Sequence, residues 1–471
     1  MISMRALSFR PSFRLRMSAA LVAACATLAL SAQTPPQQPP PPKQPQEVVL
    51  TISSGSPGLP PKVAVPDFVA LSSDAETVAA ARTIGQVLWD DLNFEREFYL
   101  ISRDTYRTIP AATSIDQVPL DQWKQLGADA LVVGTVRRVV GGGVAVQMRL
   151  VEVGTGASAM AKEYTGSIAN PRLYAHTMSD EIHLQQRRLR GVARTKLAFT
   201  SDRDGERMNG PVKTRGISNI YMSDYDGANQ KRVSVTRATD IAPAWSPDGK
   251  TIAYTSYRSN YPDIIVQSVY ELREYLKPAR GSPEKSNFLP AWSPDGEKLA
   301  FMSNRDGGNL EIYLVNRDGS GLRRLTNHPE NDASPTWSPT GSQIAFTSNR
   351  SGNPQIYIMN ADGTGPAEQI TRESWCDRPT WSPAPFNEIA YASRTGAGYD
   401  IRIFDFATRS FKTITDGIGS NESPTFSPNG RHIAFTSTRA GKEQIFVIDR
   451  DGKNLRQITR GGMNRYPNWS Q

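Results

Sequence analysis

The sequence predicts two folded domains, an N-terminal α/β domain and an all-β six-bladed propeller closed by the C-terminal strand. The prediction rests mainly on a repeat in residues 194–471. A Trp-Ser-Pro phrase is followed by a short apolar strand with a central alanine, and successive alanines lie 44 to 47 residues apart. A fixed period of this length, with several short strands in each unit, is typical of a β-propeller.

One unit shows how the repeat forms a blade. Pro290–Trp292 is a short first strand, and Ser293–Gly296 is a turn in which proline presets φ and glycine accepts an unusual backbone angle. The second, third and outer strands are Leu299–Ser303, Glu311–Val315 and Leu322–Thr326. One such sheet cannot bury both of its faces alone, so we expect the sheets to stack in a ring.

The two ends of the repeat region predict how the ring closes. The first unit begins at Leu197–Ser201 with no Trp-Ser-Pro before it, and Tyr466–Ser470 is a first strand with no unit after it. Together these two pieces complete one blade. The second strands then centre on Ala198, Ala253, Ala300, Ala345, Ala390 and Ala434, and the first strands contain Trp245, Trp292, Trp337, Trp381, Phe426 and Trp469.

Residues 47–193 follow a different pattern and predict a compact α/β domain. Apolar residues at helical spacing, such as Val78, Ala81, Ile84 and Leu88, indicate a helix over Ala75–Leu92. We expect further helices at Leu120–Leu126 and Pro171–Arg190, extended segments at Lys62–Val65, Phe98–Ile101, Ala130–Val136 and Val144–Val153, and a hairpin turn at Gly141–Gly143.

Residues 1–32 predict a secretion signal. Basic residues precede the apolar run Met17–Leu30, and Ser31-Ala32 offers a small-residue cleavage point. A retained anchor is the alternative, but the run is short for a membrane span. Val22–Cys25 resembles a lipobox, and the apolar residues that continue past Cys25 disfavour lipidation there. Residues 33–46 are rich in Pro and Gln and predict a disordered tether.

Charge and motifs exclude several classes of function. The net charge is +8, and it falls to +4 (8 minus 4) without the four arginines of the N-terminal segment, Arg5, Arg10, Arg14 and Arg16. Acidic and basic residues are interspersed in the repeats, which argues against a nucleic-acid partner. The sequence contains no G-x-S-x-G elbow, P-loop or dinucleotide fingerprint. We therefore expect no catalytic residue and no cofactor.

We expect no metal site either. His176 and His183 lie seven residues apart on a predicted helix, but H-E-x-x-H is absent and no third ligand is evident. The acidic segments Asp202–Gly205, Asp224–Gly227 and Asp362-Gly363 are interpreted as reverse turns, because the other ligand positions of a calcium loop are missing. If Cys25 leaves with the signal, Cys376 remains alone and no intramolecular disulfide can form.

Polar side chains cluster just before the first strand of each blade. Because innermost strands start beside the channel of a propeller, these side chains are expected to ring one of its mouths. One hypothesis is that the ring recognises a partner, and the other is that Asp and Asn merely cap the incoming loop. The residues proposed for recognition are Asn287, Asp332, Asp377, Asn421, Glu422, Asn464 and Arg465.

The chain resembles the TolB family, the periplasmic component of the Tol–Pal envelope system. Glu47–Gly55 is similar to the mature N-terminal segment of the family, the TolB box. Val63–Phe68, Leu131–Gly134 and Tyr174–Ile182 resemble its α/β domain. Ser223–Gly227 and the closing Pro467–Ser470 resemble its propeller. In the family the box begins directly after signal cleavage, whereas here fourteen residues, 33–46, precede it. The mouth loops also differ in identity from the family pattern.

The resemblance implies a monomeric, non-enzymatic adaptor in the periplasm, peripheral to the membranes, that supports outer-membrane integrity and cell division. It implies that the propeller mouth binds a Pal-like peptidoglycan-associated lipoprotein. It also implies that the box binds a TolA-like inner-membrane protein through Glu47, Val48, Val49, Leu50, Thr51, Ile52, Ser53, Ser54 and Gly55.

Two other functions remain open. The alternative from another class is a propeller that binds or processes envelope glycans or peptides, with Asp332, Asp377 and Glu422 as channel carboxylates. A third is a factor for envelope secretion, because Val63–Phe68 also looks like part of secretion-associated domains. This third function explains the propeller less well.

Overall fold

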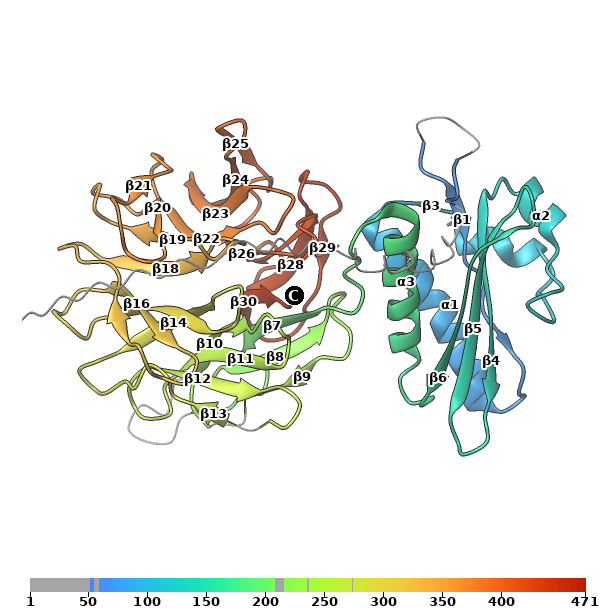
Figure 1. Ribbon diagram of the computed structural model, residues 1–471, viewed down its shortest axis with the longest axis horizontal. Helices are drawn as coiled ribbons and strands as arrows, with labels where there is room; N and C mark the ends of the chain where they lie inside the picture. The colour runs from blue at the N-terminus through green and yellow to red at the C-terminus, as the bar shows by residue number, and fades with distance from the viewer. Residues whose placement is uncertain (1–50, 55–58, 208–215, 235–236, 273) are drawn as a thin grey trace, which may run out of the picture. The chain divides into compact units, whose positions relative to one another are not determined.

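The computed structural model describes residues 51–54, 59–207, 216–234, 237–272 and 274–471. The described residues belong to one compact unit. An α/β domain precedes a propeller of six four-stranded sheets, so the predicted fold class is confirmed (Figure 1). Across these ranges no helix combines the length and the apolar character needed to cross a membrane.

The α/β domain is built on one mixed sheet with the strand order β3-β1-β4-β5-β6, and β2 pairs with β4. Strand β1 is parallel to β3 and β4, and the β4-β5-β6 meander is antiparallel. Helices α1 and α3 cover one face around a core that includes Ile84, Leu88 and Ile182 (Figure 1). The strands are β1 (Lys62–Ala64), β2 (Val69–Ala70), β3 (Tyr99–Leu100), β4 (Ala130–Arg138), β5 (Val144–Glu152) and β6 (Ser158–Gly166).

Three helices of this domain lie close to their predicted positions, and the 3-10 helix η1 was not predicted. The helices are α1 (Ala75–Glu95), the 3-10 helix η1 (Arg103–Thr108), α2 (Leu120–Gln125) and α3 (Pro171–Arg187). Asp74 caps α1 by accepting a hydrogen bond from the backbone N–H of Thr77 at 3.0 Å. Helix α1 extends one turn beyond the predicted end. That extra turn holds Phe94 and Glu95, which are buried against the propeller.

Strand β6 was not predicted from the sequence. It is an edge strand with a mostly exposed polar segment, Lys162–Gly166, so its residues lack the apolar pattern that identifies a buried strand. Its pairing with β5 extends the sheet over the side of α3.

Each blade of the propeller is an antiparallel four-stranded sheet (Figure 1). In order of the ring, the blades are: blade 1, β30 (Asn464–Trp469), β7 (Lys196–Ser201), β8 (Asn219–Asp224) and β9 (Lys231–Arg232); blade 2, β10 (Asp240–Trp245), β11 (Thr251–Ser256), β12 (Asp263–Ser268) and β13 (Glu274–Leu276); blade 3, β14 (Asn287–Trp292), β15 (Lys298–Ser303), β16 (Glu311–Asn316) and β17 (Arg323–Arg324); blade 4, β18 (Asp332–Trp337), β19 (Gln343–Ser348), β20 (Gln355–Asn360) and β21 (Glu368–Gln369); blade 5, β22 (Cys376–Trp381), β23 (Glu388–Thr395), β24 (Gly398–Asp405) and β25 (Ser410–Thr413); and blade 6, β26 (Asn421–Phe426), β27 (His432–Ser437), β28 (Gln444–Asp449) and β29 (Arg456–Gln457).

The ring closes as predicted. The last strand, β30, pairs with β7, with Trp469 opposite Leu197 and Asn464 opposite Ser201. The indole N–H of Trp469 donates to Thr195 Oγ1 at 2.7 Å, and the backbone N–H groups at both ends of the pairing are bonded. The chain terminus therefore completes blade 1 and holds the first and last blades together.

Neighbouring blades share apolar cores. The central alanine of each second strand is fully buried, and large side chains of the next blade pack against this small residue and its neighbours. Between blades 2 and 3, for example, Ala253 and Ile264 lie in one cluster with Trp292 and Phe301. This small-against-large packing makes the disc a rigid scaffold.

Candidate functional site

Every first strand carries the same distortion beside the channel. A proline recurs inside each first strand, and the residue before it has φ between 50° and 54°, in the left-handed region. These residues are Ala242, Leu289, Ser334, Arg378, Ser423 and Tyr466. Each lies at a register shift between the first and second strands. A non-glycine residue in this region is strained, and such strain persists only where its surroundings hold it.

Threonines of the preceding blade hold most of these bulges. Ala242 donates its backbone N–H to Thr200 Oγ1 at 3.0 Å, and Leu289 donates to Thr255 Oγ1 at 3.0 Å. Arg378 and Tyr466 make the equivalent bonds to Thr347 and Thr436, at 3.2 and 3.1 Å. The bulges therefore join one blade to the next as well as shaping the channel.

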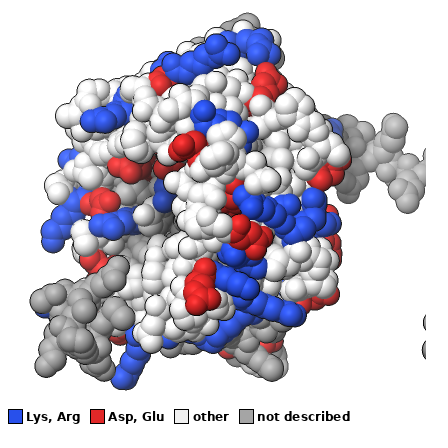
Figure 2. All heavy atoms as spheres, turned by 90° about the vertical axis from the view of Figure 1, so that its left-hand side faces the viewer, with Lys and Arg blue, Asp and Glu red and all other residues white. Residues whose placement is uncertain are grey.

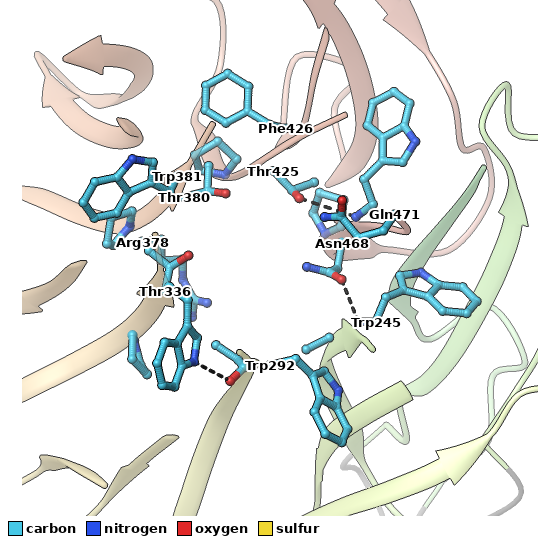
Figure 3. Close-up of a pocket in the computed structure, with 18 of the residues that line it drawn as sticks. Trp245, Trp292, Thr336, Arg378, Thr380, Trp381, Thr425, Phe426, Asn468 and Gln471 are labelled. Carbon is cyan, nitrogen blue, oxygen red and sulfur yellow. Dashed lines mark hydrogen bonds between the residues drawn. The ribbon is translucent and has the colours of Figure 1, made fainter. Parts of the chain in front are cut away.

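The first strands enclose a channel of about 550 Å³. Thr336, Thr380, Thr425 and Asn468 point into it, whereas the indole rings of Trp245, Trp292 and Trp381 point away (Figure 3). Asn468 also accepts a hydrogen bond from the Trp245 backbone N–H at 2.8 Å. Prolines of the first strands complete the lining, which thus combines small polar groups with apolar surface on rigid strands.

Arg378 and Tyr466 meet across two blades at the mouth where the first strands begin. The guanidinium of Arg378, from blade 5, lies 4.4 Å from the ring centroid of Tyr466, from blade 1. Blade 6 stands between them and contributes only the small Ser423 at this level. This cation–π contact narrows the mouth on one side.

The structure corrects part of the predicted ring at this mouth. Asn287, Asp332, Asn421 and Asn464 are fully buried and do not line it. Each instead accepts a hydrogen bond from an arginine of its own blade. The distances are 2.7 Å from Arg305 to Asn287, 2.7 Å from Arg350 to Asp332, 3.3 Å from Arg439 to Asn421 and 2.7 Å from Arg203 to Asn464.

The arginines explain why a polar residue is needed there. The Arg350 guanidinium lies over the rings of Phe346 and Tyr357, at 5.3 and 5.0 Å, and reaches the start of the first strand from there. A buried charged donor requires an acceptor. In these four blades the hypothesis that the Asn or Asp holds the incoming loop therefore describes the contacts better than a recognition role.

The other three predicted mouth residues are partly or fully exposed to solvent. Asp377, Glu422 and Arg465 follow the buried position by one residue, in blades 5, 6 and 1. Asp377 accepts from Thr347 Oγ1 at 2.8 Å, Glu422 accepts from Ser420 at 2.7 Å, and Arg465 is paired with Glu443. The three charged residues of the mouth therefore lie on three consecutive blades.

Sequence reasoning missed three apolar side chains on the same blades. Trp375, Ile418 and Met463 lie in the loops that enter the first strands of blades 5, 6 and 1, with 37%, 56% and 38% of their surface exposed. The sequence did contain a signal for Trp375. Trp375 stands where the repeats of blades 2, 3, 4 and 6 have Thr239, Ser286, Asn331 and Ser420.

We name the six residues Trp375, Asp377, Ile418, Glu422, Met463 and Arg465 the mouth sector. Buried aromatic and aliphatic anchors surrounded by charges are typical of protein-binding surfaces. On the molecular face shown in Figure 2, Lys and Arg are interspersed with Asp and Glu, so no field of a single sign covers it.

The described part of the N-terminal box lies against the α/β domain. Ile52 is buried in the core beneath α1 and α3, and its backbone N–H donates to Gln186 Oε1 at 2.9 Å. Thr51 is exposed. Glu47, Val48, Val49, Leu50 and Gly55 lie outside the described residues, as do the predicted signal (1–32) and tether (33–46).

The histidines and acidic turns are accounted for by contacts within the protein. His183 Nδ1 lies 2.9 Å from the Ser179 carbonyl oxygen, and His176 Nδ1 lies 2.8 Å from Asp91 Oδ2. The described ranges contain no cluster of three His, Cys, Asp or Glu residues able to hold a metal ion. Burial raises the pKa of the Cys376 thiol to about 12, so this cysteine is not a nucleophile at neutral pH.

Comparisons with known proteins agree on one family. Residues 187–471 match the TolB beta propeller domain, and residues 49–159 match the TolB amino-terminal domain. The Tol-Pal system protein TolB of Desulfosudis oleivorans is 34% identical over 266 residues, which cover 56% of this chain and 57% of that protein. Its counterpart in Anaeromyxobacter dehalogenans is 33% identical over 286 residues, 60% of this chain and 61% of the relative.

The matched stretch thus spans about three fifths of these curated relatives. Among solved structures, TolB from Acinetobacter baumannii is similar in fold, with a TM-score of 0.69. It is 24% identical in sequence, and the match covers 88% of this chain and 97% of the solved one.

Proposed function

Since the chain belongs to the TolB family, we propose that it is a non-enzymatic adaptor of a Tol–Pal-like envelope system. It acts in the periplasm, after export by the signal in residues 1–32, as a monomer peripheral to the membranes. There it supports outer-membrane integrity and cell division. The single observation that carries the proposal is the mouth sector, which joins exposed apolar anchors to charged residues on one rigid disc.

The propeller binds its partner, a Pal-like lipoprotein, through the mouth sector. Trp375, Ile418 and Met463 supply apolar surface that binding would remove from water, which is favourable by about 25 cal/mol per Å² of apolar area. Asp377, Glu422 and Arg465 supply charges of both signs, which select orientation more than they add affinity. The buried Asn287, Asp332, Asn421 and Asn464 act indirectly, since they fix the loops that carry these contacts.

The box, Glu47–Gly55, binds a TolA-like protein. Ile52 and the Gln186 side chain tie the described part of this segment to the α/β domain. A docked and a released box are two states, and a partner that binds the released state would shift the population toward it. The Pro/Gln-rich residues 33–46 give the segment reach.

Binding to a purified Pal-like lipoprotein, measured by calorimetry, tests the first part. Trp375→Ala and Ile418→Asp are expected to weaken binding by about tenfold or more each, because anchors of this kind contribute about 2 kcal/mol. Leu322→Asp is the matched control, since Leu322 is 39% exposed but lies beside the outer strand of blade 3. Equal affinity of all three variants and the wild type would remove the mouth sector from the proposal.

Deletion of residues 33–55 tests the second part. The deletion should abolish binding to a TolA-like protein and leave binding of the propeller partner within about twofold. Gln186→Ala is the finer variant, because it removes the acceptor of the Ile52 backbone N–H and weakens docking of the box without changing the box itself. It should strengthen TolA-like binding if the released box is the competent state, and unchanged binding in both variants would contradict this role.

The glycan or peptide hypothesis keeps one specific observation in its favour. Asp377 and Glu422 lie at the mouth near the exposed indole of Trp375, although Asp332 is buried and paired with Arg350. Incubation with envelope glycan fragments and peptides should give no turnover if the adaptor role is right. Turnover that is lost in Asp377→Asn would replace the adaptor by an enzyme.

A further inference from the structure

Two buried histidines lie where the helices of the α/β domain contact blades 1 and 6. His176 belongs to α3 and His432 to β27, and each is only 2% exposed. Each imidazole stands between one carboxylate of helix α1 and one carboxylate of the propeller. We call these two groups of three residues, Asp91–His176–Asp224 and Glu95–His432–Asp449, the histidine bridges.

In the first bridge, His176 Nδ1 lies 2.8 Å from Asp91 Oδ2, and Nε2 lies 3.7 Å from Asp224 Oδ2. The Tyr225 hydroxyl donates to the other oxygen of Asp91 at 2.7 Å. The ring therefore has a carboxylate on each side, one from α1 and one from blade 1.

The other charged groups around this bridge come from α3 and blade 1. Arg172 reaches Asp224 at 3.3 Å and Asp226 at 2.6 Å, and Lys196 pairs with Asp224. These cations anchor Asp224 as a carboxylate, but His176 alone faces both Asp224 and Asp91.

In the second bridge, His432 Nδ1 lies 3.0 Å from Asp449 Oδ1, and Nε2 lies 3.5 Å from Glu95 Oε2. Glu95 also accepts from the Val192 backbone N–H at 2.9 Å and from Asn429 Nδ2 at 3.1 Å. The carboxylate is thereby fixed in place. Burial by itself raises the pKa of Glu95, but the hydrogen bond and charge of His432, with the charges of His183 and Arg431, outweigh burial and lower it.

Three further cations face the second bridge. Arg96 pairs with Asp449 at 3.5 Å, Arg431 pairs with Glu97, and the guanidinium of Arg456 lies 4.4 Å from the ring centroid of Phe94. They surround the bridge without occupying the position between its two carboxylates, which His432 holds.

The protonation state of the imidazoles decides whether these contacts attract. Burial by itself disfavours an imidazolium, but Asp224 and Asp91 outweigh burial and raise the pKa of His176 to about 9. Burial likewise opposes the charge on His432, while Asp449 and Glu95 raise its pKa. A neutral imidazole would leave two buried carboxylates without a shared cation, which is costly.

We propose that the histidine bridges make the docking of α1 and α3 on the propeller depend on pH. The imidazolium form of each ring holds the two domains together, because it attracts both of its carboxylates. The stabilisation is complete below the unfolded pKa of histidine, about 6.5, and is lost as pH rises through the folded value. For His176 it falls progressively between about pH 6.5 and pH 9, so alkali weakens the junction. This dependence does not rest on either partner proposed above.

A histidine NMR titration of the wild-type protein gives the first test. The Cε1 signals of His176 and His432, assigned with single variants, should titrate above pH 6.5, and His176 near pH 9. Titration of both rings at or below pH 6.5 would overturn the proposal, whether or not any variant folds.

Small-angle X-ray scattering across the same pH range gives the second test. The population with separated domains should rise by about tenfold or more between pH 7 and pH 10, since one pKa unit corresponds to a factor of ten. His176→Gln/His432→Gln should show that population already at pH 7 and lose the pH dependence.

The control is His328→Gln. His328 lies between β17 and β18, away from the junction, and its Nδ1 accepts a hydrogen bond from the Glu330 backbone N–H at 3.1 Å. This variant should follow the wild type. Scattering that stays constant from pH 6 to pH 10 in the wild type, or a control that behaves like the double variant, would overturn the role of the bridges.

Discussion

Blades 4 and 5 differ at one pair of positions beside the start of the first strand, and the difference explains the polar residue at the start of most blades. In blade 4, Asp332 accepts from Arg350, which lies over two aromatic rings. In blade 5 the equivalent positions are Cys376 and Thr395. The acceptor and the arginine are thus replaced together, which indicates that they form one structural unit.

Blade 5 uses a different arrangement for the same space. Glu373 accepts from Tyr391 at 2.8 Å and pairs with Arg402 at 2.9 Å. Thr395 turns toward Asp400, and the hairpin of β23 and β24 has eight residues in each strand, against six in the second and third strands of blade 4. Blade 5 thus has no arginine at the position of Arg350, and its longer hairpin lies in the same blade as the exposed Trp375.

The largest effect is expected from breaking blade 1, in which the first strand comes from the other end of the chain. Deletion of Tyr466–Gln471 leaves β7 without its inner neighbour and exposes the core around Trp469. We expect a loss of about 5 kcal/mol or more and a melting temperature lower by about 10 °C or more, measured by calorimetry. Deletion of Gln471 alone is the control, and equal melting of both proteins would refute closure by β30.

Copying the blade 5 pair into blade 4 tests the coupling directly. Arg350→Thr leaves the Asp332 carboxylate buried without its cation and should cost about 3–5 kcal/mol in urea unfolding. Asp332→Cys/Arg350→Thr should recover most of that loss, because no buried charge remains. Additive losses in the double variant would show that the two residues act independently.

The reverse change in blade 5 should have a smaller effect. Cys376→Asn buries an amide in a blade that has Thr395 in place of the arginine donor. It should lower the free energy of unfolding by about 1–3 kcal/mol. Cys376→Ala is the matched control for lost volume and should cost about 1 kcal/mol. If the asparagine variant unfolds at the same urea concentration as the wild type, the buried position does not require an arginine partner.

The smallest effect concerns the bulges. Thr255→Val removes the acceptor of the Leu289 backbone N–H and should cost about 1 kcal/mol. The position that serves the bulge of blade 6 is Ala392, and Ala392→Thr should be neutral or stabilise by about 0.5 kcal/mol. Unfolding midpoints of the two variants compare these sites, and destabilisation by both would mean that side-chain packing outweighs the hydrogen bond.

The sequence predicted the strands of the propeller well because the repeat marks each one. A central alanine and an aromatic residue recur in all six units, and a Ser-Pro turn recurs in five of them, so the fold follows from their spacing. Edge strand β6 escaped notice because a mostly solvent-exposed strand carries no apolar alternation. The end of α1 was placed too early because a charged residue such as Glu95 is expected at the surface, whereas the propeller buries it.

The same ambiguity misplaced the predicted site. A polar residue next to a strand end looks alike whether it faces a partner or an arginine of its own blade. Residue type does not separate Asn287 and Asp332 from Asp377. Their spacing does, because the first two lie three residues before the proline of the first strand and Asp377 lies two before it, and this difference buries the first two and leaves the third at the mouth.

The sequence by itself determined the number of blades, the closure by the terminal strand and the family, because these depend on local phrases repeated at a fixed period. Only the tertiary structure decided which polar side chains are buried, which apolar side chains of the loops entering blades 5, 6 and 1 are exposed, and how His176 and His432 come to lie between carboxylates of two domains. The physical reason is that burial and charge pairing depend on residues hundreds of positions apart, such as Glu95 and His432, which meet only when the chain is folded.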